Sequence, residues 1–214
     1  MASTPSCTIP LSNHPNIVVL IAAAGTSSRM GKPKQLLPWG KTHLLGHCLI
    51  TVHTLEGVNS VTVLGAHFDQ ISERIADLPT TILHHQQWEQ GLGSSISFGI
   101  QYIRNHYATV GGVLILLADQ PLLTKEFLTE LIDRFEPGNE GIVATRYPDG
   151  HLGVPALFDV CYFDALSQLS QDRGAKSLIR AHPEKVDVVE GTHHVVDLDT
   201  EEDYLRWYRA NHQS

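Results

Sequence analysis

Three cations lie close together in the segment that follows the first apolar run of the chain. Arg29, Lys32 and Lys34 fall within six residues, in a protein whose 15 Lys and Arg are outnumbered by 23 Asp and Glu. The same segment contains Gly25 and other small residues, which let the backbone approach a ligand closely and let successive N–H groups contact phosphate oxygens. Cations beside such a backbone are suited to binding a polyphosphate.

The spacing of this segment excludes two common phosphate-binding motifs. A P-loop has four residues between its glycines and a Ser or Thr after its Lys, whereas here five residues separate Gly25 from Gly31 and Pro33 follows Lys32. The dinucleotide motif GxGxxG is absent from this turn. The alternative is an ordinary strand-to-helix connection with solvated cations, but such loops usually have only about 2–6 residues.

A carboxylate in the middle of the chain is a candidate ligand for a divalent metal ion. Asp119 follows the apolar run 113–117, so its side chain is expected at the carboxyl end of a buried strand. Mg²⁺ (or Mn²⁺) prefers one or two carboxylates together with phosphate oxygens and water. The alternative for Asp119 is a turn residue ahead of Pro121, because Asp is common in turns.

Small and hydroxyl-bearing residues occur together at Gly93, Ser94 and Ser95. Uncharged groups of this size suit a base or ribose pocket, which makes Gly93 and Ser94 candidate nucleotide-binding residues. The alternative is that a serine caps the helix expected over 94–105, since Ser is a preferred N-cap.

The elements that must position these residues alternate along the chain. Continuous apolar runs predict buried strands, and apolar residues at helical spacing predict helices. Strands are expected at 17–23, 60–64, 81–83, 113–117, 141–145, 154–158, 186–189 and 195–196, and helices at 42–55, 68–76, 94–105, 125–135 (capped by Thr124), 160–169, 175–180 and 200–207. This order predicts an α/β fold with a mostly parallel, doubly wound (Rossmann-like) sheet, whose ligands bind beyond the carboxyl ends of the strands. The loops after Ala23 and after Leu117 are therefore the expected binding region.

Five segments, in order, resemble the MobA-like nucleotidyltransferase family, and are most similar to its molybdenum cofactor (molybdopterin) cytidylyltransferase branch. They are AAAGTSSRMGKPK at 22–34, WEQGLGSSI at 88–96, ADQP at 118–121, QDRGAK at 171–176 and DLDTEED at 197–203. The resemblance covers nearly the whole chain and implies a single domain of the nucleotide-diphospho-sugar-transferase type. We expect a flexible N-terminal lead-in over 1–16 and a MobA-like NTP transferase domain over 17–214.

The resemblance implies Mg²⁺-dependent transfer of a nucleotidyl group from a nucleoside triphosphate to a phosphorylated small-molecule acceptor. It implies catalytic roles for Lys34, Arg29 and Asp119, and a metal site of Asp119 and Asp199. The expected nucleotide-binding residues are Ala23, Ala24, Gly25, Arg29, Lys34, Gly93 and Ser94, and the expected acceptor-binding residues are Arg173 and Lys176.

Two of these assignments have alternatives in which the residues play a purely structural role. Arg173 and Lys176 have the equal alternative of solvated cations on a helix surface. Asp199 has the alternative of a place beside the last helix, which Thr200 could cap with Asp203 three residues on.

The identity of the substrates depends on departures from the family patterns. Ala24 stands where the guanylyl branch has a glycine in L-A-G-G, and Pro33 precedes Lys34 where that branch has Asp, so the resemblance favours CTP over GTP and molybdopterin as the acceptor. Val154 replaces the His of the family's G-H-P, and Gln171 replaces the Gly of G-D-x-G-A-R, which leaves another phosphorylated acceptor open. Further alternatives are a guanylyltransferase, a methylerythritol phosphate cytidylyltransferase, or a non-catalytic nucleotide-binding module for cofactor maturation.

Composition limits the partners and the compartment. The net charge of −8 and the lack of a polybasic block argue against binding to nucleic acid. The longest apolar run, of eight residues, is shorter than the roughly 20 of a membrane helix. Residues 1–16 lack the Lys, Arg and apolar stretch of a signal peptide, and three scattered cysteines are typical of free thiols. We therefore expect a cytoplasmic protein, with a molybdoenzyme or its chaperone as a candidate protein partner.

Adjacent histidines occur twice in the chain, at His84-His85 and at His193-His194. Neither pair has the ligand spacing of a zinc site. We expect surface or loop histidines without a metal role.

Overall fold

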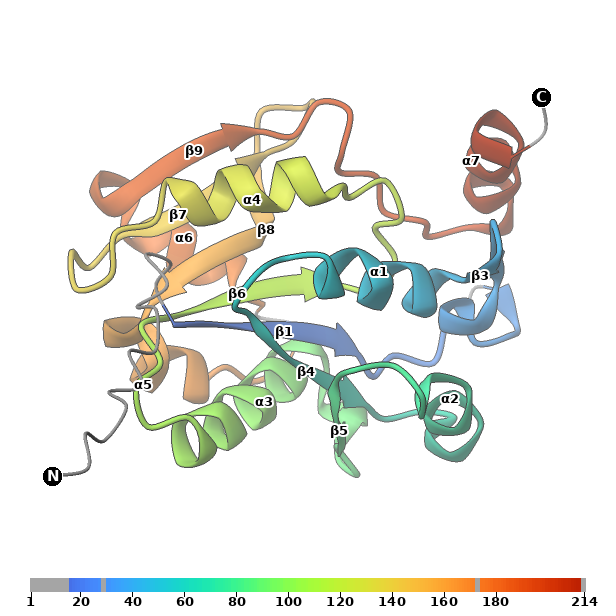
Figure 1. The fold of residues 1–214 in the computed structure, drawn as a ribbon, viewed down its shortest axis with the longest axis horizontal. Helices are drawn as coiled ribbons and strands as arrows, with labels where there is room; N and C mark the ends of the chain where they lie inside the picture. Colours follow the sequence, from blue (N-terminus) through green and yellow to red (C-terminus); the bar gives the residue numbers. More distant parts are fainter. Residues whose placement is uncertain (1–15, 28–29, 172–173, 213–214) are drawn as a thin grey trace, which may run out of the picture.

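The computed structural model describes residues 16–27, 30–171 and 174–212. Its centre is a seven-stranded sheet with the order β5-β4-β1-β6-β8-β7-β9 (Figure 1). The strands are β1 (Ile17–Ala23), β4 (Asn59–Leu64), β5 (Thr81–His84), β6 (Gly112–Leu117), β7 (Ile142–Arg146), β8 (Leu152–Asp159) and β9 (Val186–Glu190). Strands β5, β4, β1 and β6 are mutually parallel, β7 is parallel to β9, and β8 is antiparallel to both of its neighbours. The predicted α/β fold with a mostly parallel sheet is confirmed.

The strand order reverses its direction of growth between β1 and β6, and this switch point creates the crevice that the sequence predicts. All seven residues of β1 are buried, as expected for a strand covered on both faces. From β1 the chain passes to β4 on one side and then returns to β6 on the other side. Adjacent parallel strands whose connections run in opposite directions leave a crevice at their carboxyl ends. The loops after Ala23 and Leu117 border this crevice.

Helices cover both faces of the sheet (Figure 1). Apolar side chains of α1 (Leu44–His53), α2 (Phe68–Ile75) and α4 (Lys125–Asp133) join one core cluster with one face of β1 and β6. Those of α3 (Leu92–His106), α5 (Phe163–Ser167) and α6 (Lys176–Ala181) join a second cluster on the other face. Thr124 caps α4 as predicted, because its Oγ1 accepts a hydrogen bond from the Phe127 N–H at 3.3 Å.

A third, smaller cluster holds the C-terminal helix at the end of the molecule where the parallel strands finish (Figure 1). Helix α7 (Glu201–His212) packs on the two-stranded hairpin formed by β2 (Pro38–Trp39) and β3 (Thr42–His43). The Tyr204 hydroxyl donates to the Pro38 carbonyl at 2.9 Å. The segment between β9 and α7 is thereby held beside the crevice.

Several predicted boundaries are wrong for local reasons. The helix expected from Thr42 begins at Leu44, because residues 42–43 pair with 38–39 across a turn in which Gly40 has a φ of 57°. The helix expected over 160–169 is divided into a 3₁₀ turn, η4 (Val160–Tyr162), and α5. No strand forms at 195–196, which belongs to an irregular connection, and α7 continues to His212.

Three further 3₁₀ turns are η2 (Lys34–Leu36), η3 (Trp88–Gln90) and η5 (Pro183–Lys185). Among the residues that the structure describes, no helix is both long enough and apolar enough to cross a membrane.

Candidate active site

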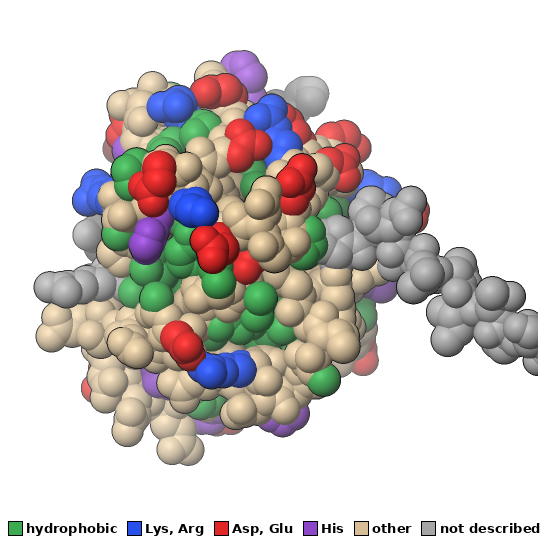
Figure 2. All heavy atoms as spheres, turned by 90° about the vertical axis from the view of Figure 1, so that its left-hand side faces the viewer, with side chains coloured by type: hydrophobic (Ala, Val, Ile, Leu, Met, Phe, Trp, Pro, Cys, Tyr) green, Lys and Arg blue, Asp and Glu red, His purple; other side chains and the backbone are tan. Residues whose placement is uncertain are grey.

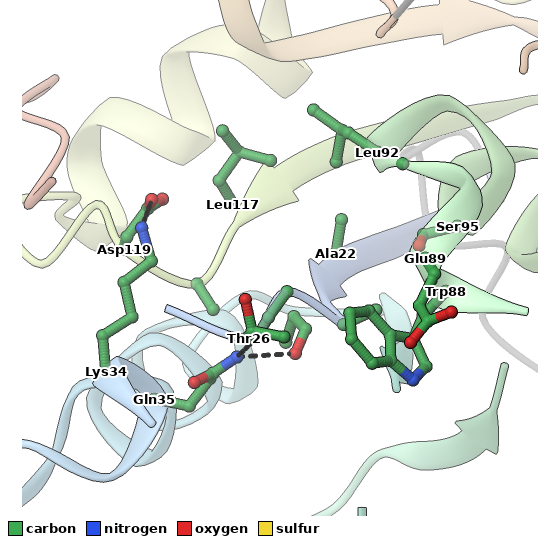
Figure 3. A pocket seen from close by; sticks show the side chains of 15 residues that line it. Ala22, Thr26, Lys34, Gln35, Trp88, Glu89, Leu92, Ser95, Leu117 and Asp119 are labelled. Atoms are coloured by element: carbon green, nitrogen blue, oxygen red, sulfur yellow. Dashed lines mark hydrogen bonds and ion pairs between the residues drawn. The ribbon is translucent and has the colours of Figure 1, made fainter. Parts of the chain in front are cut away.

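A cavity of about 350 Å³ lies at the carboxyl ends of β1 and β6 (Figure 3). Both loops predicted from the order of the elements line it. The lining residues come from four segments: Ala22, Ala23, Ala24, Gly25 and Thr26; Lys34 and Gln35; Trp88, Glu89, Gly91, Leu92 and Ser95; and Leu117, Ala118 and Asp119.

The loop after β1 is closed by the buried side chain of Gln35. Its Nε2 donates to the carbonyl oxygens of Ala23 and Gly25, both at 2.9 Å (Figure 3). Its Oε1 accepts from the Ser27 hydroxyl at 3.3 Å, and the Ser27 oxygen accepts from the Lys34 N–H at 3.0 Å. One amide therefore fixes the small-residue turn and the position from which Lys34 extends into the cavity.

Lys34 and Asp119 point toward one another across the cavity wall and form an ion pair (Figure 3). Their side chains are 21% and 13% exposed, so the pair is largely shielded from solvent. The Lys34 Nζ also lies 3.7 Å from Asp199 Oδ1 and donates to the Leu198 carbonyl at 3.5 Å. Asp199 reaches this point because the Leu198 N–H donates to the Asp119 carbonyl at 3.1 Å. The structure thus brings together three residues that the sequence assigns to one site.

The carboxylates around Lys34 fit a divalent cation. One Asp119 oxygen contacts Lys34, while the other is buried and has no hydrogen-bond partner among the described residues. Within the described ranges, no group of three or more His, Cys, Asp or Glu side chains is placed to hold a metal alone. Mg²⁺ and Mn²⁺ bound by two carboxylates complete their coordination with phosphate oxygens and water. The unpartnered Asp119 oxygen is suited to such an ion when a polyphosphate is present.

A third carboxylate, Asp197, belongs to the same cluster of negative charge. Its Oδ1 accepts from Gln120 Nε2 at 2.8 Å, and the same nitrogen lies 2.6 Å from the Tyr147 hydroxyl. Burial raises the pKa of Asp197, and the negative charge of Asp119 raises it further. Burial and the nearby Asp197 likewise raise the pKa of Tyr147. This network holds Asp197 at the end of β6 and strengthens the attraction of the site for cations.

Charge is distributed differently at the opposite end of the molecule. Figure 2 shows acidic and basic side chains interspersed on that face, where Lys185 pairs with Glu140 at 3.0 Å. At the cavity, by contrast, the amine of Lys34 lies near Asp119 and Asp199 and interacts electrostatically with Asp197. An added cation at the cavity would therefore interact with more than one carboxylate.

On the nucleotide side, the structure presents different residues from those predicted. Gly93 and Ser94 are buried and do not line the cavity, whereas Gly91 and Ser95 do. The helix begins at Leu92, two residues earlier than expected, which changes the direction in which each side chain points. The N-cap is Gly91, and no side chain caps the helix, so the predicted alternative of a serine cap is wrong.

Several expected cations lie elsewhere. Lys32 pairs with Glu201 at 3.3 Å on the surface and does not line the cavity. Lys176 begins α6, and its charge contributes to the lowered pKa of Asp149, after the hydrogen bond from the His151 backbone. Lys176 therefore lies toward the turn between β7 and β8. Arg29 and Arg173 lie outside the described residues.

The alternative for Asp199 is also present. The Thr200 Oγ1 accepts from the Asp203 N–H at 3.1 Å and donates to the Asp203 carboxylate at 2.6 Å, which caps α7 as predicted. Asp199 is thus next to a helix N-terminus and also 3.7 Å from Lys34.

Sequence reasoning missed Gln35, Gln120 and Asp197 as site residues. Gln35 and Gln120 are 2% and 1% exposed. Their signal in the sequence was only adjacency, since Gln35 follows Lys34, Gln120 follows Asp119, and Asp197 belongs to the quoted DLDTEED segment. Adjacency does not show which side chain turns inward.

Comparisons with known proteins agree with this geometry. Residues 19–186 match the family model described as the MobA-like NTP transferase domain. The nicotine blue oxidoreductase of Paenarthrobacter nicotinovorans is 29% identical over 202 residues, covering 90% of this chain and 96% of that protein. The bifunctional protein GlmU of Thermobifida fusca (strain YX) is 30% identical over 137 residues, which are 62% of this chain and only 28% of GlmU.

A solved structure resembles the chain over nearly its whole length. The crystal structure of Rv0371c from Mycobacterium tuberculosis H37Rv has a TM-score of 0.79 and 28% identity, covering 92% of this chain and 100% of that one. A further crystal structure of Rv0371c is a complex with manganese. The family match covers well over half of the chain, and this chain therefore belongs to the MobA-like NTP transferase family of nucleotidyltransferases.

Proposed function

We propose that this protein transfers CMP from CTP to a phosphorylated small molecule, with molybdopterin as the expected acceptor, and releases pyrophosphate. The observation that carries the proposal is the meeting of Lys34, Asp119 and Asp199 beside a cavity lined by the small residues of the loop after β1. Polyphosphate binding needs the cation and the close backbone, and metal-assisted transfer needs the carboxylates.

The cavity has two ends of different character (Figure 3). Lys34 and Asp119 are at one end, and Trp88 and Ser95 are at the other, with the loop of Thr26 between them. In this proposal the triphosphate lies at the Lys34 end and the base and ribose at the Trp88 end. Ala23, Ala24, Gly25 and Arg29 contact the phosphates, and Gly93 and Ser94 support the nucleotide from behind the cavity wall. Arg173 and Lys176 contact the acceptor.

The chemistry needs no general base, because a phosphate acceptor is already an anion. An acceptor oxygen forms a bond to the α-phosphorus while the bond to the bridging oxygen breaks, and pyrophosphate leaves with the electron pair. Lys34 neutralises the leaving group and positions it, which is the main contribution expected of a protein to such a transfer. Mg²⁺ or Mn²⁺ held by Asp119 and Asp199 would supply further positive charge there.

The name of one relative raises a second candidate, an oxidoreductase reaction. We consider it here with a nicotinamide dinucleotide as the hydride carrier. Hydride transfer has no evident use for two carboxylates around Lys34 at the end of the cavity. This chain also lacks GxGxxG in the loop after β1. These features favour nucleotidyl transfer.

Free thiols favour the cytoplasm, where a molybdoenzyme or its chaperone would receive the product.

The test is thermal unfolding with CTP, GTP, ATP, UTP and NADH, each with and without Mg²⁺ or Mn²⁺, followed by pyrophosphate release in the presence of the acceptor. A ligand at 100 times its Kd adds about 2.7 kcal/mol to the free energy of unfolding, and each kcal/mol shifts the Tm by about 2–4 °C for a chain of this size. We expect the largest metal-dependent shift with CTP. A preference for GTP would indicate a guanylyltransferase, stabilisation by NADH alone an oxidoreductase, and no shift a module without this activity.

A further inference from the structure

A buried histidine lies behind the nucleotide side of the cavity. His85 directly follows β5 and lies in the connection to η3, as expected for a loop histidine, but it is 7% exposed and is therefore not a surface residue. Its N–H donates to the Leu64 carbonyl at 2.8 Å, so the residue continues the sheet and its ring turns inward. The ring stacks on Phe98 of α3 with a centroid distance of 4.8 Å. Strand pairing and stacking together fix the position of the imidazole.

The imidazole begins a chain of hydrogen bonds with a defined direction. His85 Nε2 lies 3.0 Å from the Ser94 oxygen, and the Ser94 hydroxyl donates to the Gly91 carbonyl at 2.8 Å. A carbonyl only accepts, so the single hydroxyl proton of Ser94 goes to Gly91, and Ser94 accepts from His85. Burial lowers the pKa of His85, and the neighbouring His84 lowers it further. The neutral ring therefore carries its proton on Nε2.

The last group in this chain belongs to the cavity wall. Gly91 has a φ of 96° and a ψ of 179°, a conformation that side chains other than hydrogen rarely permit. Its N–H donates to the Trp88 carbonyl at 3.0 Å, and its carbonyl also accepts from the Ser95 N–H at 3.4 Å. The orientation of this one glycine therefore sets how Trp88 and Ser95 face the cavity.

We propose that His85, acting through Ser94, is a positioning residue that holds the Gly91 turn in the form that binds the base and ribose of the nucleotide. The inference rests on the proposed function. His85 contacts no substrate and takes no part in the transfer. Its contribution is confined to the nucleotide end of the cavity, far from the Lys34 and Asp119 pair (Figure 3).

Matched variants separate this role from a merely structural one. His85→Gln keeps an N–H near the position of Nε2, His85→Asn is too short to reach Ser94, and Ser94→Ala removes the relay. The control is His84→Asn, because His84 is exposed and stacks on Phe68 outside the cavity. Calorimetry measures the Kd of CTP with Mg²⁺, and steady-state kinetics separate the nucleotide KM from kcat.

We expect His85→Asn and Ser94→Ala each to weaken nucleotide binding by about tenfold, the effect of one hydrogen bond. Both should raise the nucleotide KM with kcat and the acceptor KM nearly unchanged. His85→Gln should restore most of the affinity, and His85→Asn combined with Ser94→Ala should cost no more than either alone. If His85→Asn fails to fold, Ser94→Ala carries the test.

Two results overturn the inference, and they are distinguishable. Equal nucleotide affinity in wild type and Ser94→Ala would refute the relay and leave the proposed function intact. The absence of nucleotide binding in the wild-type protein would refute the proposed function and this inference together.

Discussion

Replacing Lys34 by Met tests whether this amine neutralises carboxylates that otherwise bind a metal. The substitution keeps the apolar stem and removes the charge from Asp119, whose side chain is 13% exposed. Breaking a buried ion pair on one side costs about 3–5 kcal/mol, and the contact with the half-exposed Asp199 adds at most about 1 kcal/mol. With the remaining exposure, we expect a loss of about 3 kcal/mol in EDTA, which lowers the Tm by roughly 6–12 °C.

The same variant should be stabilised by metal more strongly than wild type. Without the amine, the positive charge of Lys34 no longer opposes a cation beside Asp119 and Asp199, so Mn²⁺ should raise the Tm of Lys34→Met more than that of wild type. Nucleotide binding should weaken, because Lys34 no longer contacts the triphosphate. The assay is circular dichroism melting in EDTA and in Mn²⁺, with Lys41→Met as the control, since Lys41 is exposed and forms no ion pair within the described ranges. A Lys34→Met variant that melts with wild type in EDTA, or that Mn²⁺ leaves unchanged, would refute the reasoning.

Three further substitutions test the surrounding groups. Asp119→Asn should lower kcat at least about 100-fold while the fold is retained, as measured by pyrophosphate release and circular dichroism; full activity would exclude the metal role. Gln35→Leu should reduce the free energy of unfolding by about 2 kcal/mol in urea titration, because the buried Ala23 carbonyl loses its donor; an unchanged midpoint would contradict the closing role of the amide. The pKa of Asp197 is raised in the folded protein, so its carboxyl group holds a proton more tightly in the folded state than in the unfolded state. Its stabilising contribution is therefore complete below the unfolded pKa of about 3.9 and is lost as the pH rises through the folded pKa. Wild type should gain stability relative to Asp197→Asn between pH 7 and pH 4, and parallel curves would show that the pKa is not raised.

The sequence predicts the sheet and the position of Asp119 well, for one physical reason. Long apolar runs such as β1 and β6 can only be buried, and parallel strands bring their carboxyl ends to one edge. The N-cap at Thr124 is equally local, because the capping residue is adjacent in sequence to the helix that begins after it.

Features that depend on distant partners could not be predicted in this way. The hairpin of β2 and β3 has two residues per strand, too few to show alternation, and it is held by α7 from the far end of the chain. Ser95 replaces Ser94 in the cavity because the start of α3 differs by two residues, and periodicity does not define a boundary that closely. Gln35 bonds backbone carbonyls, which every residue has, so no sequence pattern identifies its partners.

The segment that carries Asp199 has a consequence for the order in which the protein is made. It joins the site late in translation, since 164 residues separate Lys34 from Leu198. A nascent chain emerging from the ribosome acquires Lys34 and Asp119 first, and these two can pair as soon as β6 takes its place beside β1. Until the segment before α7 arrives, the growing polypeptide has the amine but lacks Asp199. The two-carboxylate site is therefore complete only once that last segment has been synthesised.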